Sequence, residues 1–168
     1  ASEFELKVLE RLIHASGDFG IQELLIFSKN SCEIGIRALK RGAPILTDTD
    51  MAASAIDTMV KNTHNNPIFS AKKWINNNVE ISSTQTAYGI EKGWLDLSNK
   101  YVGNCSPIVI FGSSPTGLEK LLDILDDSKK YPSLIVGMPV GFIGVENSKR
   151  RLLKSLYPHI VIDSTRGG

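Results

Sequence analysis

Two side chains near the N-terminus have the types and the spacing of an acid beside an anion-binding group. His14 lies three residues after Arg11, so on a helix the imidazole and the guanidinium share one face. An imidazole titrates near neutral pH and can donate a proton, while a guanidinium binds carboxylates. A second interpretation stays open, because a cationic histidine at a helix C-terminus also stabilises the helix without doing chemistry.

Five short loops rich in glycine, hydroxyl and acidic residues are the other candidates for a site. They comprise residues 47–50, 83–85, 112–117, 137–144 and 164–168. Each follows a short apolar segment, and in open parallel sheets ligands bind beyond the carboxyl ends of the strands. Glycines and helix N-termini there offer backbone N–H groups to an anion. Helix capping is the simpler explanation for any one loop, but the five together favour a ligand crevice.

These loops do not carry the known signatures of nucleotide sites. Residues 112–117 have the glycine spacing of a phosphate loop, but Leu118 and Glu119 follow where a lysine and a serine or threonine are needed. Residues 137–144 do not match the G-x-G-x-x-G pattern, and Pro139 would interrupt a dinucleotide-binding turn. We therefore predict no nucleotide, nicotinamide or flavin cofactor.

The sequence also gives no pattern for a metal site. The histidines His14, His64 and His159 are scattered and form no H-x-x-x-H or His/Cys cluster. Asp48 and Asp50 follow a predicted strand at a spacing seen in magnesium sites. However, Asp50 as the cap of the next helix explains this spacing more simply. We predict that the protein binds no metal.

The segments that must position these residues alternate between short apolar strands and amphipathic helices. Strands are predicted at residues 44–47, 79–82, 108–111, 134–136 and 160–162, and helices between them at 51–60, 86–97, 118–125 and 145–156. Helical periodicity also covers residues 4–14, and residues 21–39 with a break near 28–31. Alternating strands and helices are typical of a parallel sheet, so we predict a three-layer α/β/α fold.

Size and charge limit the possible classes of protein. The 168 residues suit one domain with a single core, and the net charge of +1 gives no reason to expect nucleic acid or an anionic membrane as partner. Cys32 and Cys105 lie far apart and outside any C-x-x-C pair, which favours buried thiols in a reducing compartment. Because no apolar run is long enough to cross a membrane and no signal peptide is visible, we expect a cytoplasmic protein.

Several strings together resemble one family, the precorrin-8X methylmutases, or precorrin isomerases, of cobalamin biosynthesis. The similar strings are R-L-I-H-A-S-G-D-F at residues 11–19, G-A-P-I-L-T-D at 42–48 with Met51, S-P-T at 114–116, and G-M-P-V-G-F-I-G at 137–144 with Glu146, Ser148 and Lys149. Their order and spacing span nearly the whole chain, and the glycine-rich string is the most specific. The resemblance identifies residues 1–168 as a single domain of this family.

The resemblance implies a flavodoxin-like, five-stranded parallel sheet with an extra N-terminal helical segment, and a homodimer. It also implies an intramolecular methyl shift from C11 to C12 of precorrin-8X or cobalt-precorrin-8, without an organic cofactor. His14 matches the family's catalytic acid, and Arg11 matches the arginine that accompanies it. We expect contacts to the corrinoid from Arg11, Asp48, Thr84, Gly112, Ser114, Thr116, Gly141, Phe142, Gly144 and Arg166. Phe142 could instead belong to the core.

Other interpretations stay open at this stage. Members of the family usually have further residues before the position of Ala1, including a serine that contacts the substrate, and a helical segment after residues 166–168. We therefore expect the chain to be truncated at one or both ends. A tetrapyrrole-binding carrier would use the same crevice without catalysis. A flavodoxin-like signalling receiver fits less well, because its lysine should lie at a strand end, whereas Lys149 is predicted within a helix.

Overall fold

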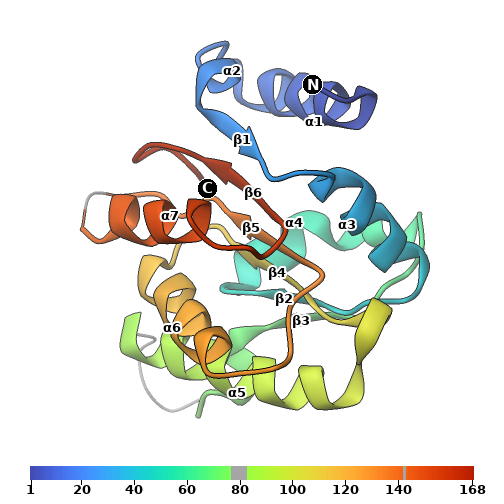
Figure 1. Ribbon diagram of the computed structural model, residues 1–168, viewed down its shortest axis with the longest axis vertical. Helices are drawn as coiled ribbons and strands as arrows, with labels where there is room; N and C mark the ends of the chain where they lie inside the picture. Colours follow the sequence, from blue (N-terminus) through green and yellow to red (C-terminus); the bar gives the residue numbers. More distant parts are fainter. Residues whose placement is uncertain (77–82, 142) are drawn as a thin grey trace.

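The computed structural model of the protein places a six-stranded sheet between two layers of helices (Figure 1). It describes residues 1–76, 83–141 and 143–168. The strands are β1 (Leu25–Phe27), β2 (Ile45–Thr47), β3 (Ile68–Ser70), β4 (Ile108–Phe111), β5 (Leu134–Gly137) and β6 (His159–Ile162). The helices are α1 (Glu3–Ser16), α2 (Ile21–Leu24), α3 (Ser31–Lys40), α4 (Asp50–Lys61), α5 (Ser83–Lys100), α6 (Pro115–Asp126) and α7 (Val145–Leu153), with short 3-10 helices η1 (Ala71–Trp74) and η2 (Gly103–Cys105).

The sheet has the strand order β1-β6-β5-β4-β2-β3. The five strands β2 to β6 are parallel to one another, whereas β1 pairs antiparallel with β6 at the edge. Without β1, this is the flavodoxin-like order, in which the direction of strand addition reverses between β2 and β4. Ligands of such sheets bind beyond the carboxyl ends of the strands at this reversal, which directs attention to the loops after β2 and β4.

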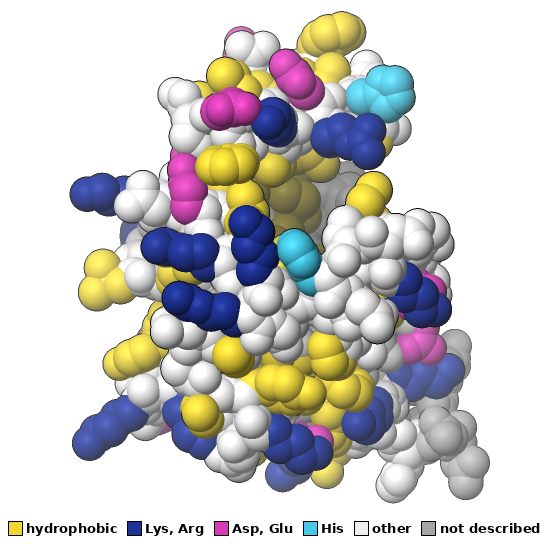
Figure 2. All heavy atoms as spheres, turned by 90° about the vertical axis from the view of Figure 1, so that its right-hand side faces the viewer, with side chains coloured by type: hydrophobic (Ala, Val, Ile, Leu, Met, Phe, Trp, Pro, Cys, Tyr) yellow, Lys and Arg dark blue, Asp and Glu magenta, His cyan; other side chains and the backbone are white. Residues whose placement is uncertain are grey.

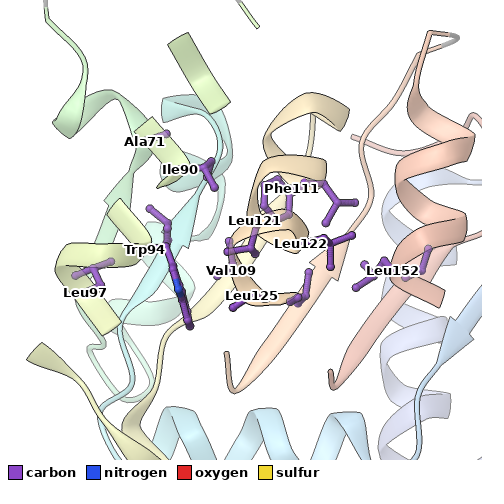
Figure 3. Packing of buried hydrophobic residues seen from close by; sticks show 14 residues of the cluster. Ala71, Ile90, Trp94, Leu97, Val109, Phe111, Leu121, Leu122, Leu125 and Leu152 are labelled. Carbon is purple, nitrogen blue, oxygen red and sulfur yellow. The ribbon is translucent and has the colours of Figure 1, made fainter. Parts of the chain in front are cut away.

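The main core lies between the sheet and helices α5, α6 and α7. Figure 3 shows Val109 and Phe111 of β4 facing side chains of α5 and α6, among them Trp94 and Leu121, and these four side chains are buried. A second apolar cluster lies on the other face of the sheet, beneath α1 and α3. Burial on both faces explains why the central strands are continuous apolar runs.

The predicted α/β/α class and the flavodoxin-like set of five parallel strands are confirmed, but the sheet also has a sixth, antiparallel strand, β1, which the sequence did not predict. Residues 25–27 were expected in a helix, and they form β1 because pairing with β6 outweighs the weak helical periodicity of a short apolar run. One of the parallel strands, β3, was also not predicted. It has three residues, follows Pro67 and is too short to stand out from the sequence. The strand predicted at residues 79–82 lies outside the described residues.

Within the described part of the chain, no helix combines the length and the apolar character needed to span a bilayer.

The buried His159 gives an expected dependence of stability on pH. Burial lowers its pKa below the ordinary value of 6.5, although the Tyr157 carbonyl, 2.8 Å from Nδ1, acts in the opposite direction. As the pH falls below 6.5, the unfolded chain takes up a proton that the folded chain resists, so stability is lost. We expect the urea midpoint of unfolding to fall between about pH 7.5 and about pH 5.5.

The measurement compares two histidine variants. His159→Gln should show a smaller fall in the urea midpoint than the parent protein, because it cannot take up the proton. His64 is exposed, so His64→Gln should retain the full fall and serves as the control. Equal falls in both variants would contradict the assignment to His159.

Candidate active site

Asp48 lies at the point where the direction of the parallel sheet reverses, directly after β2. Its side chain is buried, and its carboxylate accepts hydrogen bonds from the backbone N–H groups of Gly112 at 3.1 Å, Ser113 at 2.8 Å and Ser114 at 2.7 Å. These donors belong to the loop between β4 and α6. Asp48 therefore ties the loops after two neighbouring strands together, and much of its accepting capacity is used within the protein.

The loop after β4 leads into a capped helix. Ser114 is the N-cap of α6 and accepts a hydrogen bond from the N–H of Gly117 at 2.9 Å. The hydroxyl of the exposed Thr116 lies 3.3 Å from that of Ser114. At Gly112, a Cβ would find only Ala52 within contact distance, at 3.9 Å, so the backbone there is open to an approaching group. The capping predicted for such loops thus coexists with an accessible backbone.

The loops after β5 and β6 lie against each other. The N–H of Gly141 donates to the Thr165 carbonyl at 3.3 Å, and the N–H of Gly168 donates to the Met138 carbonyl at 2.9 Å. Gly141 has φ +133° and Gly144 has φ +75°, a region that favours glycine over all other residues. Gly144 begins α7 without a side-chain cap, and the N-terminus of a helix favours an anion.

Lys149 of α7 binds the backbone of the loop after β6. It is fully buried, and its Nζ donates to the carbonyls of Ser164 at 2.7 Å and Arg166 at 2.5 Å. Burial lowers the pKa of Lys149 to about 8, and the charge of Asp163 opposes this shift. The sequence placed Lys149 within a helix correctly but gave no reason to expect this contact with the chain end.

The N-terminal helix α1 brings His14 to the same end of the molecule. His14 lies in the last turn of α1, before the left-handed C-cap Gly17, and both His14 and Arg11 are exposed. Four residues after His14, the carboxylate of Asp18 pairs with the Arg166 guanidinium at 2.8 Å. The end of α1 is therefore joined to the loop after β6.

A hollow of about 520 Å³ separates the end of α1 from the two C-terminal loops. Its walls include Leu12 and Ala15 of α1, Val140 of the glycine-rich loop, and residues 166–168. A second, apolar cavity of about 370 Å³ lies further along α1, between this helix and the sheet. In Figure 2 the surface is hollowed beneath the helix at the top of the view. Large apolar side chains are exposed at this end, among them Phe19 at 77% and Ile143 at 93%.

The structure brings most of the predicted site residues to one end of the sheet. Asp48, Gly112 and Ser114 form one group, and Gly141 and Arg166 form another. A Cβ built on Gly144 would lie 4.0 Å from Pro115, so the loop before α7 lies beside the start of α6 and links the groups.

Four predicted site residues do not belong to either of these two groups. Arg11 and His14 lie on the same end of α1 but do not line the 520 Å³ hollow. Thr84 is exposed in the first turn of α5, and Phe142 lies outside the described residues. Asp18 was not assigned a role from the sequence, although it stands within the string 11–19. Across residues 1–76, 83–141 and 143–168, no three His, Cys, Asp or Glu side chains lie close enough together to hold a metal ion.

The strand order, together with loops that converge where it reverses, defines a flavodoxin-like α/β protein with a candidate ligand site at the carboxyl ends of its strands. The chain belongs to the precorrin-8X methylmutase family, whose model matches residues 1–168. The resemblance found in the sequence is thereby confirmed.

Relatives and solved structures support this membership along the whole chain. A precorrin-8X methylmutase from Sinorhizobium sp. is 32% identical over 99% of this chain and 78% of its own length. A cobalt-precorrin-8 methylmutase from Leptospira interrogans is 30% identical over 98% of this chain and 76% of its own length. The crystal structure of precorrin-8X methylmutase from Thermus thermophilus superposes with a TM-score of 0.84 at 29% identity, covering 100% of this chain and 80% of that one.

Proposed function

We propose that the protein is an isomerase that moves a methyl group from C11 to C12 of precorrin-8X or cobalt-precorrin-8. The product would be hydrogenobyrinate or cobyrinate, in cobalamin biosynthesis. The observation that carries this proposal is the match of the whole chain, residues 1–168, to the methylmutase family. Curated relatives bear the names of both the metal-free and the cobalt reaction, so the chain is assigned to the shared chemistry.

In this proposal His14 is the catalytic acid. A proton placed on the conjugated macrocycle changes its electron distribution and lowers the barrier to methyl migration, so a single proton donor suffices. The exposure of His14 at the end of α1 is suited to a substrate that covers it. Arg11, three residues earlier on the same helix, would bind a carboxylate arm of the substrate and keep the macrocycle against the imidazole.

The remaining acetate and propionate arms would be held by the strand-end loops. The start of α7 is the best candidate, because Gly144 provides no side-chain cap and the N-terminus of a helix favours an anion. Ser114 already occupies one such group of α6, and the loop N–H groups before it bind Asp48. We therefore propose Asp48 and Ser114 as residues that shape the loop, with Gly141, Gly144 and Arg166 nearer to the substrate.

We also propose a homodimer located in the cytoplasm. The exposed Phe19 and Ile143 beside the crevice are suited to burial by the macrocycle or by a second subunit. A twofold dimer is the commonest assembly of soluble enzymes, and the family resemblance implies one. Sedimentation should give a dimer at micromolar concentration, and a monomer would contradict this part of the proposal.

Turnover separates an isomerase from a carrier. We expect the protein to convert metal-free precorrin-8X, its cobalt complex, or both in a time-dependent manner, with a changed absorbance spectrum because migration to C12 alters the conjugation. The mass of the product should equal that of the substrate. An immediate, saturable spectral shift that reverses when the ligand is displaced, with no change of product, would instead identify a carrier. The names of the relatives give no support to that alternative.

A further inference from the structure

We propose that Lys149 is a positioning residue for the methyl shift. It fixes the loop after β6, and through the Arg166–Asp18 pair it sets the position of the end of α1 that carries His14. The inference rests on the proposed role of His14. It adds to that role the contacts that fix the position of the weakly packed helix α1.

The first step is the contact between Lys149 and the loop. A lysine that is fully buried is rare unless its ammonium group has partners, and here the partners are two backbone carbonyls from the same loop. Those carbonyls, of Ser164 and Arg166, lie on either side of Thr165. Simple packing of α7 against the sheet would be served better by an apolar side chain, so the buried ammonium group indicates a role in holding the loop.

The second step is the close packing of this loop on the glycine-rich loop. A Cβ added at Gly167 would overlap the Met138 carbonyl oxygen, so the two backbones touch. Hydrogen bonds from Gly168 to Met138 and from Gly141 to Thr165 join the loops on both sides of that contact. By fixing residues 164–166, Lys149 also fixes the glycine-rich loop relative to the chain end.

The third step leads to α1. Arg166 Nη1 pairs with Asp18, and a Cβ at Gly20 would lie 2.9 Å from that nitrogen, so the guanidinium lies directly on the turn after α1. The N–H of Asp18 donates to the Ser16 hydroxyl at 3.1 Å, and this hydroxyl donates to the Leu12 carbonyl at 2.7 Å. The connected bonds therefore end in the turn of α1 that contains His14.

This connection matters because α1 has few other restraints. None of its side chains is buried, so packing alone fixes its position weakly. The Arg166–Asp18 pair is largely exposed and adds little to the stability of the whole protein. Its loss should therefore alter where His14 lies without unfolding the protein, and errors of position of about 1 Å can lower a rate by about a hundredfold.

Lys149→Met removes the donors and keeps a flexible side chain of similar length. We expect faster amide hydrogen exchange at Gly141 and Gly168, and a kcat reduced by about tenfold or more. The urea midpoint of unfolding should change little, while the exchange rates and kcat change clearly. The control is Lys154→Met, which changes an exposed lysine at the end of the same helix and should alter neither exchange nor kcat. Unchanged exchange and unchanged kcat in Lys149→Met would overturn the proposal.

A second pair of variants tests the connection without touching the core. Gly20→Ala should displace the Arg166 guanidinium, and Asp18→Asn removes the charge of its partner. Both should lower kcat, and Lys149→Met combined with Asp18→Asn should cost less than the product of the two single effects, because they act through one network. Independent, multiplicative effects would refute the connection to α1.

The outcomes also separate this inference from the proposed function. If the parent protein converts neither form of the substrate, the methyl shift and any role of Lys149 in it are both rejected. Exchange at Gly141 and Gly168 then still decides whether Lys149 holds the loop. If the parent protein is active and His14→Ala is not, but Asp18→Asn and Gly20→Ala leave kcat unchanged, the proposed function stands and the positioning role fails.

Discussion

His14→Ala is expected to lower turnover of the corrinoid substrate by at least about a hundredfold, the lower end of the usual effect of a general acid. The fold should be preserved, because the His14 side chain is exposed in the last turn of α1 and makes no hydrogen bond among the described residues. Alanine is also the best helix former, so the helix itself should persist. Binding of the substrate should change little, since other groups are proposed to hold the carboxylate arms.

The measurement is single-turnover absorbance with His64→Ala as the matched control. His64 is an exposed histidine in a loop far along the chain from α1, and its replacement should leave the rate unchanged. A spectral titration checks that His14→Ala still binds the substrate. Near-normal turnover in this variant would eliminate His14 as the acid, and a loss of binding would assign it a contact role instead.

Asp48→Ala is expected to destabilise the protein by about 3 to 5 kcal/mol. The change leaves the backbone N–H groups of Gly112, Ser113 and Ser114 without their acceptor in a part-buried site. Each unsatisfied buried donor costs about 1 to 3 kcal/mol, reduced where water can enter. Because Asp48 joins the loops after β2 and β4, the change should also disturb the crevice and lower turnover.

Urea unfolding gives the free energy for this comparison. Asp48→Asn keeps one accepting oxygen and should lose less stability than Asp48→Ala. Asp57→Ala is the matched control, because Asp57 is paired with Lys61 on the surface of α4 and its loss should cost about 0.5 kcal/mol or less. A cost below about 1 kcal/mol for Asp48→Ala would show that the loops do not depend on this carboxylate.

The sequence was sufficient for the parts of the fold that depend on local pattern. The helices α4 and α6 lie close to their predicted positions because their apolar periodicity and the strands before them agree. The predicted cap of α4 is wrong: Thr49, whose hydroxyl accepts from the N–H of Ala52, is the N-cap, and Asp50 is the first residue of the helix. The strand β1 was mistaken for helix because three apolar residues suit either structure, and its partner β6 lies at the other end of the chain. Such distant pairing leaves no local trace in the sequence.

In the site, too, features set by neighbouring residues could be predicted, whereas contacts between residues far apart in the sequence could not. The glycine-rich loop could be found because glycines with positive φ are needed where they occur, at Gly141 and Gly144. The roles of Asp48 and Lys149 could not be found, because their partners lie 64 and 15 or more residues away and are backbone atoms of any residue type. A pairing of a side chain with backbone atoms constrains only one of the two sequence positions.

The antiparallel pairing of β1 with β6 also sets the order in which the protein can assemble. Leu25 pairs with Ile162, so more than 130 further residues must be synthesised before β1 has a partner. Contacts this distant close large loops and form late in folding. The segment that carries His14 precedes β1 and is joined to the loop after β6 through Asp18 and Arg166. A nascent chain that has not yet reached residue 162 can therefore have part of its parallel sheet built while the helix that carries His14 still lacks the contacts that place it.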